Sequence, residues 1–459
     1  MTAAQPGSRS EVLRLAWPIG VSMVSFTMKG FVDMAMVGQL GTDALGAVGI
    51  ASVTAWLALT FPWGVLRGQR PLVSQYLGAN QRERAFSFGA HAFYMAAFAG
   101  LLVMCSYRVL GAGFAAFAGS TELTAEAVAQ ARVYFETRMV WSLPMLLTFA
   151  VAEYMRSVGR TRVPMVVDLV VHPLNILFNW ALIFGHLGMP ALGVYGAALG
   201  TGLADTGGML LLFYLARPSG GIAAGALKLR WDRMKEVLQV GFTGGIQFSL
   251  ESASFLGVTW IVGHAGKQAL AVHQAGIQLI HLSLLPAVAV ADAGSVLIGR
   301  YVGELRWDEV KRTLRSTLQV LFPFMTGMGL LFLLRGRELA SVFLHDDDPE
   351  RLRTALDLGA GVMAAAALWQ LADALQVTFR FSLRAVGDHH WVMWTGILCS
   401  WVLSIPLAWW VVFVLEGDVA MVWLLWGAEL FVGSAIFVWR WRSGKWMSKR
   451  LVREVQEDG

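Results

Sequence analysis

Long apolar stretches recur along the whole chain, and short polar connections separate them. A helix rises about 1.5 Å per residue, so about 20 apolar residues cross the hydrocarbon core of a bilayer. The pattern therefore predicts an all-α integral membrane protein with twelve transmembrane helices. The predicted spans are residues 13–39, 45–66, 88–107, 132–155, 163–184, 191–215, 237–262, 270–298, 314–334, 358–383, 393–413 and 418–440.

The chain also repeats itself. When Leu13 is placed on Leu238, residues 13–85 align with 238–310 without a gap, and further on "RSVG" at 156–159 aligns with "RAVG" at 384–387. Each half has an even number of helices, which predicts two six-helix lobes related by a parallel pseudo-two-fold repeat, with a solute site between them. We expect an N-lobe at 1–215, a cytoplasmic linker at 216–236, a C-lobe at 237–440 and a cytoplasmic tail at 441–459.

Composition and charge agree with a membrane protein. The chain is 56% hydrophobic and 15% charged, with a mean hydropathy of +0.57 and a pI of about 9.3. Of its 36 Lys and Arg residues, 27 fall on one side of the predicted membrane, eight fall on the other, and one lies in the first span. This positive-inside asymmetry predicts that both termini are cytoplasmic. The basic excess is therefore topological, and we expect no nucleic-acid partner.

The first span carries an ammonium and a carboxylate in an apolar context. Lys29 and Asp33 are four residues apart, so they lie on one helix face, where each can neutralise the other. Ionisable groups are costly in hydrocarbon and are retained there for pairing or function. We expect Asp33 to take part in ion coupling and Lys29 to be its resident counter-ion, which leaves most of the coupling to acids of the second half.

Three more polar residues are predicted at the depth of Asp33. Asn175 and Asn179 form an i,i+4 stripe in the fifth span, and Thr201 lies in the sixth. They are candidates to line a substrate or cation site. The alternative is that these amides and the hydroxyl bond helices together, as such residues commonly do in membranes.

The second half contains two intramembrane acids, Glu251 and Asp373, with Trp369 one turn from Asp373. Two carboxylates near one cavity can share a proton or bind a monovalent cation, and Trp369 can add cation–π attraction. The alternative is that a neighbouring hydroxyl or arginine such as Arg380 satisfies a buried acid.

Other residues rank lower as candidates. We expect the acidic run at 346–350 to be a solvated loop and helix start, and single histidines in the spans to be packing residues. No metal beyond a monovalent cation is expected. The remaining lower-ranked residues are Asp205, Asp292, Glu429, His172, His273 and His281.

With these residues in view, the chain resembles the multidrug and toxic compound extrusion (MATE) transporters, in particular their bacterial NorM-like branch. The resemblance covers about residues 13–440 and rests on several motifs in order. These are "FVDMAMVGQLGTDALGAVGIA", "LVSQYLGAN", "RSVGRTRVPM", "PLNILFNWALIFG", "GVYGAALGT", "SLESASFLG" and "ADALQV" followed by "RAVGD".

The resemblance implies a multidrug exporter of the bacterial inner membrane, which antiports organic, mostly cationic compounds against H⁺ or Na⁺ by alternating access. By motif position, Asp33, Asn175 and Thr201 match the family's N-lobe site, Glu251 and Asp373 its C-lobe acids, and Trp369 an aromatic position beside them. Asn179 stands where many members carry Asp, and Lys29 adds a positive charge, so we expect weak Na⁺ binding in the N-lobe.

Other functions of a helical membrane protein would leave different marks in the sequence. An integral-membrane transferase would need a catalytic constellation in its loops, and a lipid-linked precursor flippase of the same superfamily would need several Arg or Lys along its cavity. Neither pattern is found, and no Walker A motif indicates an ATP-driven pump. A channel stays open as an alternative.

We expect a monomer that is not an enzyme, needs no cofactor besides its coupling ion, and has the lipid bilayer and small organic molecules as partners.

Overall fold

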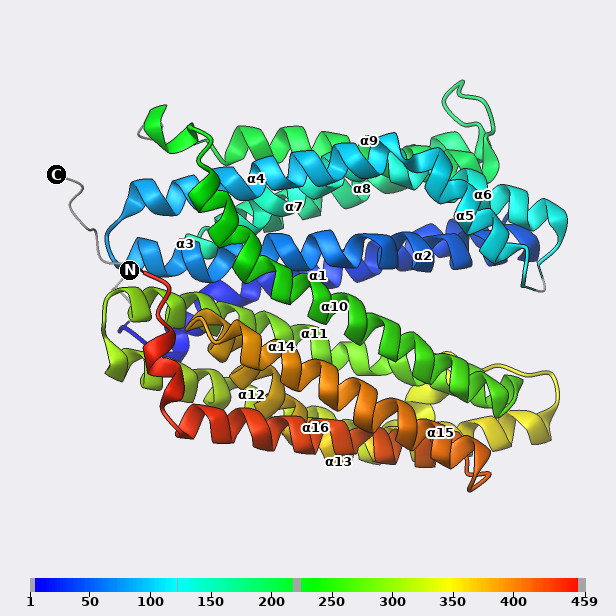
Figure 1. Ribbon diagram of the computed structural model, residues 1–459. Helices are drawn as coiled ribbons and strands as arrows, with labels where there is room; N and C mark the ends of the chain where they lie inside the picture. Colours follow the sequence, from blue (N-terminus) through cyan, green and yellow to red (C-terminus); the bar gives the residue numbers. More distant parts are fainter. Residues whose placement is uncertain (1–4, 122, 218–223, 453–459) are drawn as a thin grey trace. The chain divides into compact units, whose positions relative to one another are not determined.

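The computed structural model of the protein describes residues 5–121, 123–217 and 224–452. These residues are almost entirely helical (Figure 1). The helices of the first half are α1 (Arg9–Gly38), α2 (Thr42–Arg67), α3 (Gln69–Gly78), α4 (Arg82–Cys105), α5 (Tyr107–Ala118), α6 (Ala125–Val140), α7 (Ser142–Ser157), α8 (Arg162–Phe184) and α9 (Gly193–Leu215).

The second half has fewer but longer helices. A π-helical stretch, Cys399–Ser404, joins α14 to α15. The helices are α10 (Trp231–His264), α11 (Lys267–Gly303), α12 (Trp307–Ser341), α13 (Pro349–Ala385), α14 (His389–Leu398), α15 (Ile405–Phe413) and α16 (Val419–Arg442).

All twelve predicted spans fall on helical segments, so the predicted all-α membrane fold is confirmed. Ten helical stretches in the described residues are long and apolar enough to cross a membrane. The range 132–155 was expected as one helix, but the structure divides it at Trp141 into α6 and α7. Pro144 explains the break, because it has no N–H to donate to the carbonyl of Val140.

The internal repeat is visible in the backbone. Gly41 and Gly266, which the repeat places at equivalent positions, both have φ of +113°, a conformation that favours glycine. Asn80 and Leu305 are equivalent in the same alignment and have φ of 59° and 60°. Helix ends correspond as well: α2 and α11 begin at 42 and 267, α3 and α11 end at 78 and 303, and α4 and α12 begin at 82 and 307.

The chain divides into two compact units by its contacts. The N-terminal unit consists of residues 21–77 and 81–245, and the C-terminal unit consists of 1–20, 78–80 and 246–459. The beginning of α1 thus belongs to the C-terminal unit and the beginning of α10 to the N-terminal unit. These two boundaries, at Gly20 and Gly245, are equivalent positions of the repeat. The first helix of each half is therefore divided between the units at the same place.

The lobe boundaries expected from the sequence stay a prediction. They were defined by the predicted membrane spans, whereas the two units are defined by contacts between residues. Part of the predicted linker, 218–223, and part of the predicted tail, 453–459, lie outside the described residues. The acidic run is a helix start as expected: the side chain of Asp348 caps α13 by accepting from the N–H of Glu350 at 2.9 Å.

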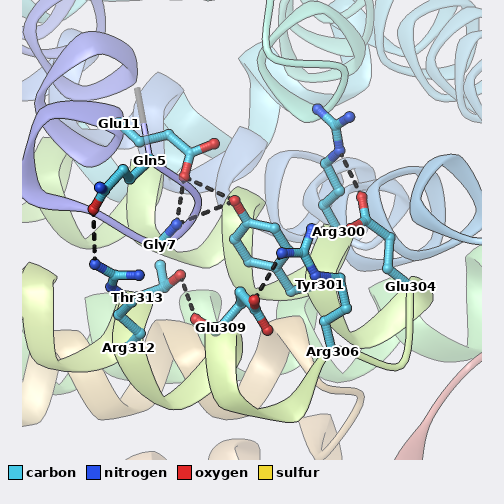
Figure 2. A network of polar contacts seen from close by, with 10 residues as sticks. All are labelled: Gln5, Gly7, Glu11, Arg300, Tyr301, Glu304, Arg306, Glu309, Arg312 and Thr313. Carbon is cyan, nitrogen blue, oxygen red and sulfur yellow. Dashed lines mark hydrogen bonds and ion pairs between the residues drawn. The ribbon is translucent and has the colours of Figure 1, made fainter. Parts of the chain in front are cut away.

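A polar network fixes the beginning of α1 within the C-terminal unit (Figure 2). The carboxylate of Glu11 accepts from the N–H of Gly7 at 2.7 Å and from the hydroxyl of Tyr301 at 2.8 Å. Gly7 has φ of +69°, and its carbonyl accepts from the hydroxyl of Ser316 at 2.7 Å. The network therefore ties α1 to both α11 and α12.

We predict that Tyr301→Phe destabilises the protein by about 1 kcal/mol, because Glu11 loses one of its donors. Glu236 and Tyr76 are the repeat equivalents of Glu11 and Tyr301, both in the N-terminal unit, so Tyr76→Phe should cost a similar amount. The measurement is the apparent unfolding temperature in detergent. Tyr195→Phe, at a side chain that is 42% exposed, is the control. Equal unfolding temperatures for all three variants would contradict the prediction.

Candidate functional site

Three helices of the N-terminal unit meet at a buried ion triad. Asp205 of α9 accepts from Lys29 Nζ of α1 at 3.2 Å through Oδ1, and from Arg138 Nη1 of α6 at 3.2 Å through Oδ2. Lys29 is 9% exposed, and the side chains of Arg138 and Asp205 are 15% and 16% exposed. One carboxylate thus binds two cations, one on each oxygen, and the triad keeps a net positive charge.

The expected direct pair between Lys29 and Asp33 is wrong. The two residues do share a helix face, but Lys29 binds Asp205, which lies on a neighbouring helix within reach of its ammonium group. Asp33 instead accepts a hydrogen bond from Asn179 Nδ2 of α8 at 2.8 Å. The charges of Lys29, Arg138 and Asp205 still act on Asp33, so the carboxylate lies beside the triad without being bound to it.

The other N-lobe candidates form a second hydrogen bond next to this one. Asn175 Nδ2 donates to Thr201 Oγ1 at 3.0 Å, which joins α8 to α9. Gly200 allows the close approach, since a Cβ there would lie 2.4 Å from Asn179 Oδ1. The Oδ1 atoms of Asn175 and Asn179 are buried and accept no hydrogen bond among the described residues. These oxygens are open to a donor or a cation.

In the C-terminal unit, Glu251 of α10 is held by an arginine. Arg380 of α13 forms an ion pair with Glu251 Oε2, and Gln247 Nε2 donates to Glu251 Oε1 at 2.7 Å. Arg384 donates in turn to Gln247 Oε1. A Cβ at Gly396 of α14 would lie 2.2 Å from Glu251 Oε1, so glycine makes room for this carboxylate.

A second acid of this unit, Glu429 of α16, is held by hydroxyl groups. Ser400 Oγ donates to Glu429 Oε1 at 3.0 Å, and Ser404 Oγ donates to Glu429 Oε2. Both serines lie in the π-helical stretch, four residues apart, where they reach the same carboxylate. Short π-helical segments are frequent at functional sites.

Asp373 of α13 differs from both, because it is 9% exposed and has no hydrogen bond or ion pair among the described residues. The charges of Arg380 and Glu429 act on it. No contact joins it to Glu251 in this part of the chain, so the structure gives no support to a proton shared between those two acids.

Trp369 belongs to the hydrophobic core of the C-terminal unit. It is 6% exposed and stacks on Trp423, with ring centroids 6.2 Å apart. A Cβ at Gly427 would lie 2.5 Å from its ring. The cation–π role expected of Trp369 toward a bound cation stays a prediction.

Sequence reasoning undervalued three charged residues. Asp205 and Glu429 were ranked low, and Arg138 was not among the candidates. All three lie inside predicted spans, and that position was the available signal, since intramembrane charges are functional by default. The described residues contain no group of three or more His, Cys, Asp or Glu side chains that could hold a metal ion.

A repeated architecture of membrane helices with intramembrane carboxylates in both halves is typical of solute transporters. The MatE family model matches residues 18–181 and 245–410, one range in each half, and the chain belongs to this family. It is thus a member of a family of multidrug efflux transporters.

Known relatives and structures agree. A probable multidrug resistance protein NorM of Thermotoga maritima is 26% identical over 99% of this chain and 97% of its own. The Bacillus subtilis protein of that name is 25% identical over 86% of this chain and 87% of its own. A MOP superfamily transporter from Pyrococcus furiosus shares the fold, with a TM-score of 0.86 at 16% identity over 97% of this chain and 99% of its own.

We predict that Asp205→Asn is the most destabilising single change in the triad, by about 3 kcal/mol, because it leaves two cations without their partner. Lys29→Met should cost less, since Arg138 still neutralises Asp205. The double variant should be more stable than Asp205→Asn alone. Apparent unfolding temperatures of the four proteins form the double-mutant cycle. Strictly additive losses would mean that Lys29 and Asp205 do not interact.

Proposed function

We propose that the protein is a secondary active exporter that moves organic, mostly cationic compounds in exchange for protons, or for Na⁺, by alternating access of its two lobes. Asp373 carries this proposal, because it is a buried carboxylate without a bonded partner among the described residues. An ionised carboxylate is costly in such a place, so a proton or a cation has to neutralise it during part of the cycle.

Protons fit the N-terminal unit better than Na⁺. Hard cations need several anionic oxygens, whereas Asp205 already binds two cations and Asp33 accepts a hydrogen bond from the amide of Asn179. We propose Asp373, Glu251 and Asp33 as the ion-coupling residues. Asp373 is the strongest candidate of the three, because Glu251 already forms an ion pair with Arg380. Lys29, Asn175, Asn179 and Thr201 would line the N-lobe site.

The proposed cargo follows from the family and from the acids. Relatives are named multidrug resistance proteins, and free carboxylates attract organic cations. We propose a location in the bacterial inner membrane with both termini in the cytoplasm, from the distribution of Lys and Arg. The transporter would act as a monomer, without a cofactor besides its coupling ion.

A lipid-linked precursor flippase is the second candidate, and it would need free cations for pyrophosphate. Lys29, Arg138 and Arg380 do lie inside the helices, which the sequence interpretation underrated. Each of them, however, is bound to a carboxylate. This pairing favours the export of cations over the flipping of anionic lipids.

The proposal is tested with the purified full chain in proteoliposomes, with a proton gradient and a Na⁺ gradient imposed separately and ethidium as the probe. We predict ethidium transport driven by the proton gradient, with Glu251→Gln and Asp373→Asn each losing it by at least about tenfold. Asp347→Asn, in an exposed loop, is the matched control and should transport normally. Unimpaired transport by both variants would give these acids structural roles.

The proposed orientation predicts which residues face the outside. In a variant without Cys105 and Cys399, single cysteines at Gln39 and Asp347 should react with an impermeant thiol reagent added to intact cells. Gln39 is exposed and avoids the strained backbone of Gly41. A cysteine at Lys228, in the predicted linker, should react after permeabilisation. The reverse pattern would overturn the orientation.

A further inference from the structure

Two polar stripes face each other along α1 and α8 within the N-terminal unit. The stripe of α1 consists of Ser22, Lys29 and Asp33, at intervals of seven and four residues, which places all three on one helix face. The stripe of α8 consists of Asp168, His172, Asn175 and Asn179, at intervals of four, three and four residues, also on one face. We call the two stripes together the α1–α8 seam.

Contacts at both ends of the seam set its register. At one end Asp33 accepts from Asn179 at 2.8 Å. At the other end the hydroxyl of Ser22 lies beside the carboxylate of Asp168, although the two do not form a well-aligned hydrogen bond. The ends are separated by the same interval on both helices, from 22 to 33 and from 168 to 179, or about 16 Å. The seam therefore extends over about half the thickness of the hydrocarbon core.

His172 lies between these ends with unused hydrogen-bonding capacity. It is 8% exposed, and neither ring nitrogen has a hydrogen-bond partner among the described residues. A buried imidazole without a partner is costly, so water or a transported group completes its bonds. The charged groups that face it are Lys29 of α1 and Asp205 of α9, which have opposite signs. The packing role expected for His172 does not explain why both of its ring nitrogens lack a hydrogen-bond partner among the described residues.

We infer that the α1–α8 seam is a proton path, in which His172 relays protons between Asp33 and Asp168. A proton leaves the carboxylic acid of Asp33 and binds the neutral imidazole of His172, which becomes imidazolium. The imidazolium then releases a proton to the carboxylate of Asp168, which passes it to water. This inference rests on the proposed proton coupling and assigns a pathway to it. In the proposed orientation, Asp168 is at the cytoplasmic end.

The intervals along the seam require water. From the level of Asn179 to His172 the path is about 10 Å, and from His172 to Asp168 about 6 Å, both longer than a hydrogen bond. Water molecules bound to the free nitrogens of His172 and the free oxygens of Asn175 and Asn179 would bridge these intervals. Nearby, Lys29 and Arg138 discourage a metal cation from following the same route.

The test separates proton transfer from substrate handling. In proteoliposomes, His172→Asn and Asp168→Asn should slow ethidium transport driven by a proton gradient by at least about tenfold. Counterflow of ethidium, which needs no net proton transfer, should stay within about twofold of the parent protein. His281→Asn, at a single intramembrane histidine of α11, is the matched control and should alter neither rate. Proton-driven rates close to those of the parent in both variants would overturn the inference.

A second measurement does not depend on transport. In the ¹⁵N-histidine-labelled chain in bilayers, the NMR signal that His172→Asn removes should titrate, and Asp33→Asn and Asp168→Asn should each displace that titration. A signal that ignores both substitutions would also overturn the inference. If the parent protein moves no ethidium under either gradient, the proposed function fails in that assay, while the NMR result still decides whether His172 exchanges protons with these two acids.

Discussion

A charge inside a bilayer must be neutralised close by, and the interior of this protein is organised around that constraint. Several buried or half-buried cations are bound to carboxylates, and one carboxylate can bind two of them. The pairs are Lys29 and Arg138 with Asp205, Arg70 and Arg156 with Glu153, Arg380 with Glu251, and Arg440 with Asp388. Asp33 and Asp373 form no such ion pair among the described residues, and we propose these two acids for proton or cation exchange.

The remaining acids are held in different ways in the two units. Asp33 accepts from an amide, Glu429 accepts from two serine hydroxyls, and Asp373 has no bonded partner among the residues described. Carboxylates that are bound by neutral donors, or by none, can take up a proton without breaking an ion pair. This distinguishes them from Asp205, whose neutralisation would leave two cations uncompensated.

The repeat preserves the scaffold and not the chemistry. Gly41 and Gly266 make the same turn, and helix ends recur at equivalent positions. Most interior charges do not recur, although Arg156 and Arg384 are equivalent. When "RSVG" is placed on "RAVG", Thr201 corresponds to Glu429, and when Leu13 is placed on Leu238, Phe26 corresponds to Glu251. Turn geometry and helix length stabilise the same fold in both halves. A buried carboxylate, in contrast, needs hydrogen-bond donors or cations from neighbouring helices, and these differ between the halves.

The helices, the repeat and the residues that could carry charge in the membrane follow from the amino-acid sequence alone, because hydrophobic length and helical spacing are local properties. Spacing also predicted correctly that Asn175, Asn179, Thr201 and Asp33 lie close together. The choice of partners, in contrast, depends on how the helices pack. Lys29 and Asp33 share a helix face, yet Lys29 binds Asp205, which is distant in the sequence. A buried charge binds the nearest opposite charge in space, and no pattern within one helix specifies what a neighbouring helix brings to it.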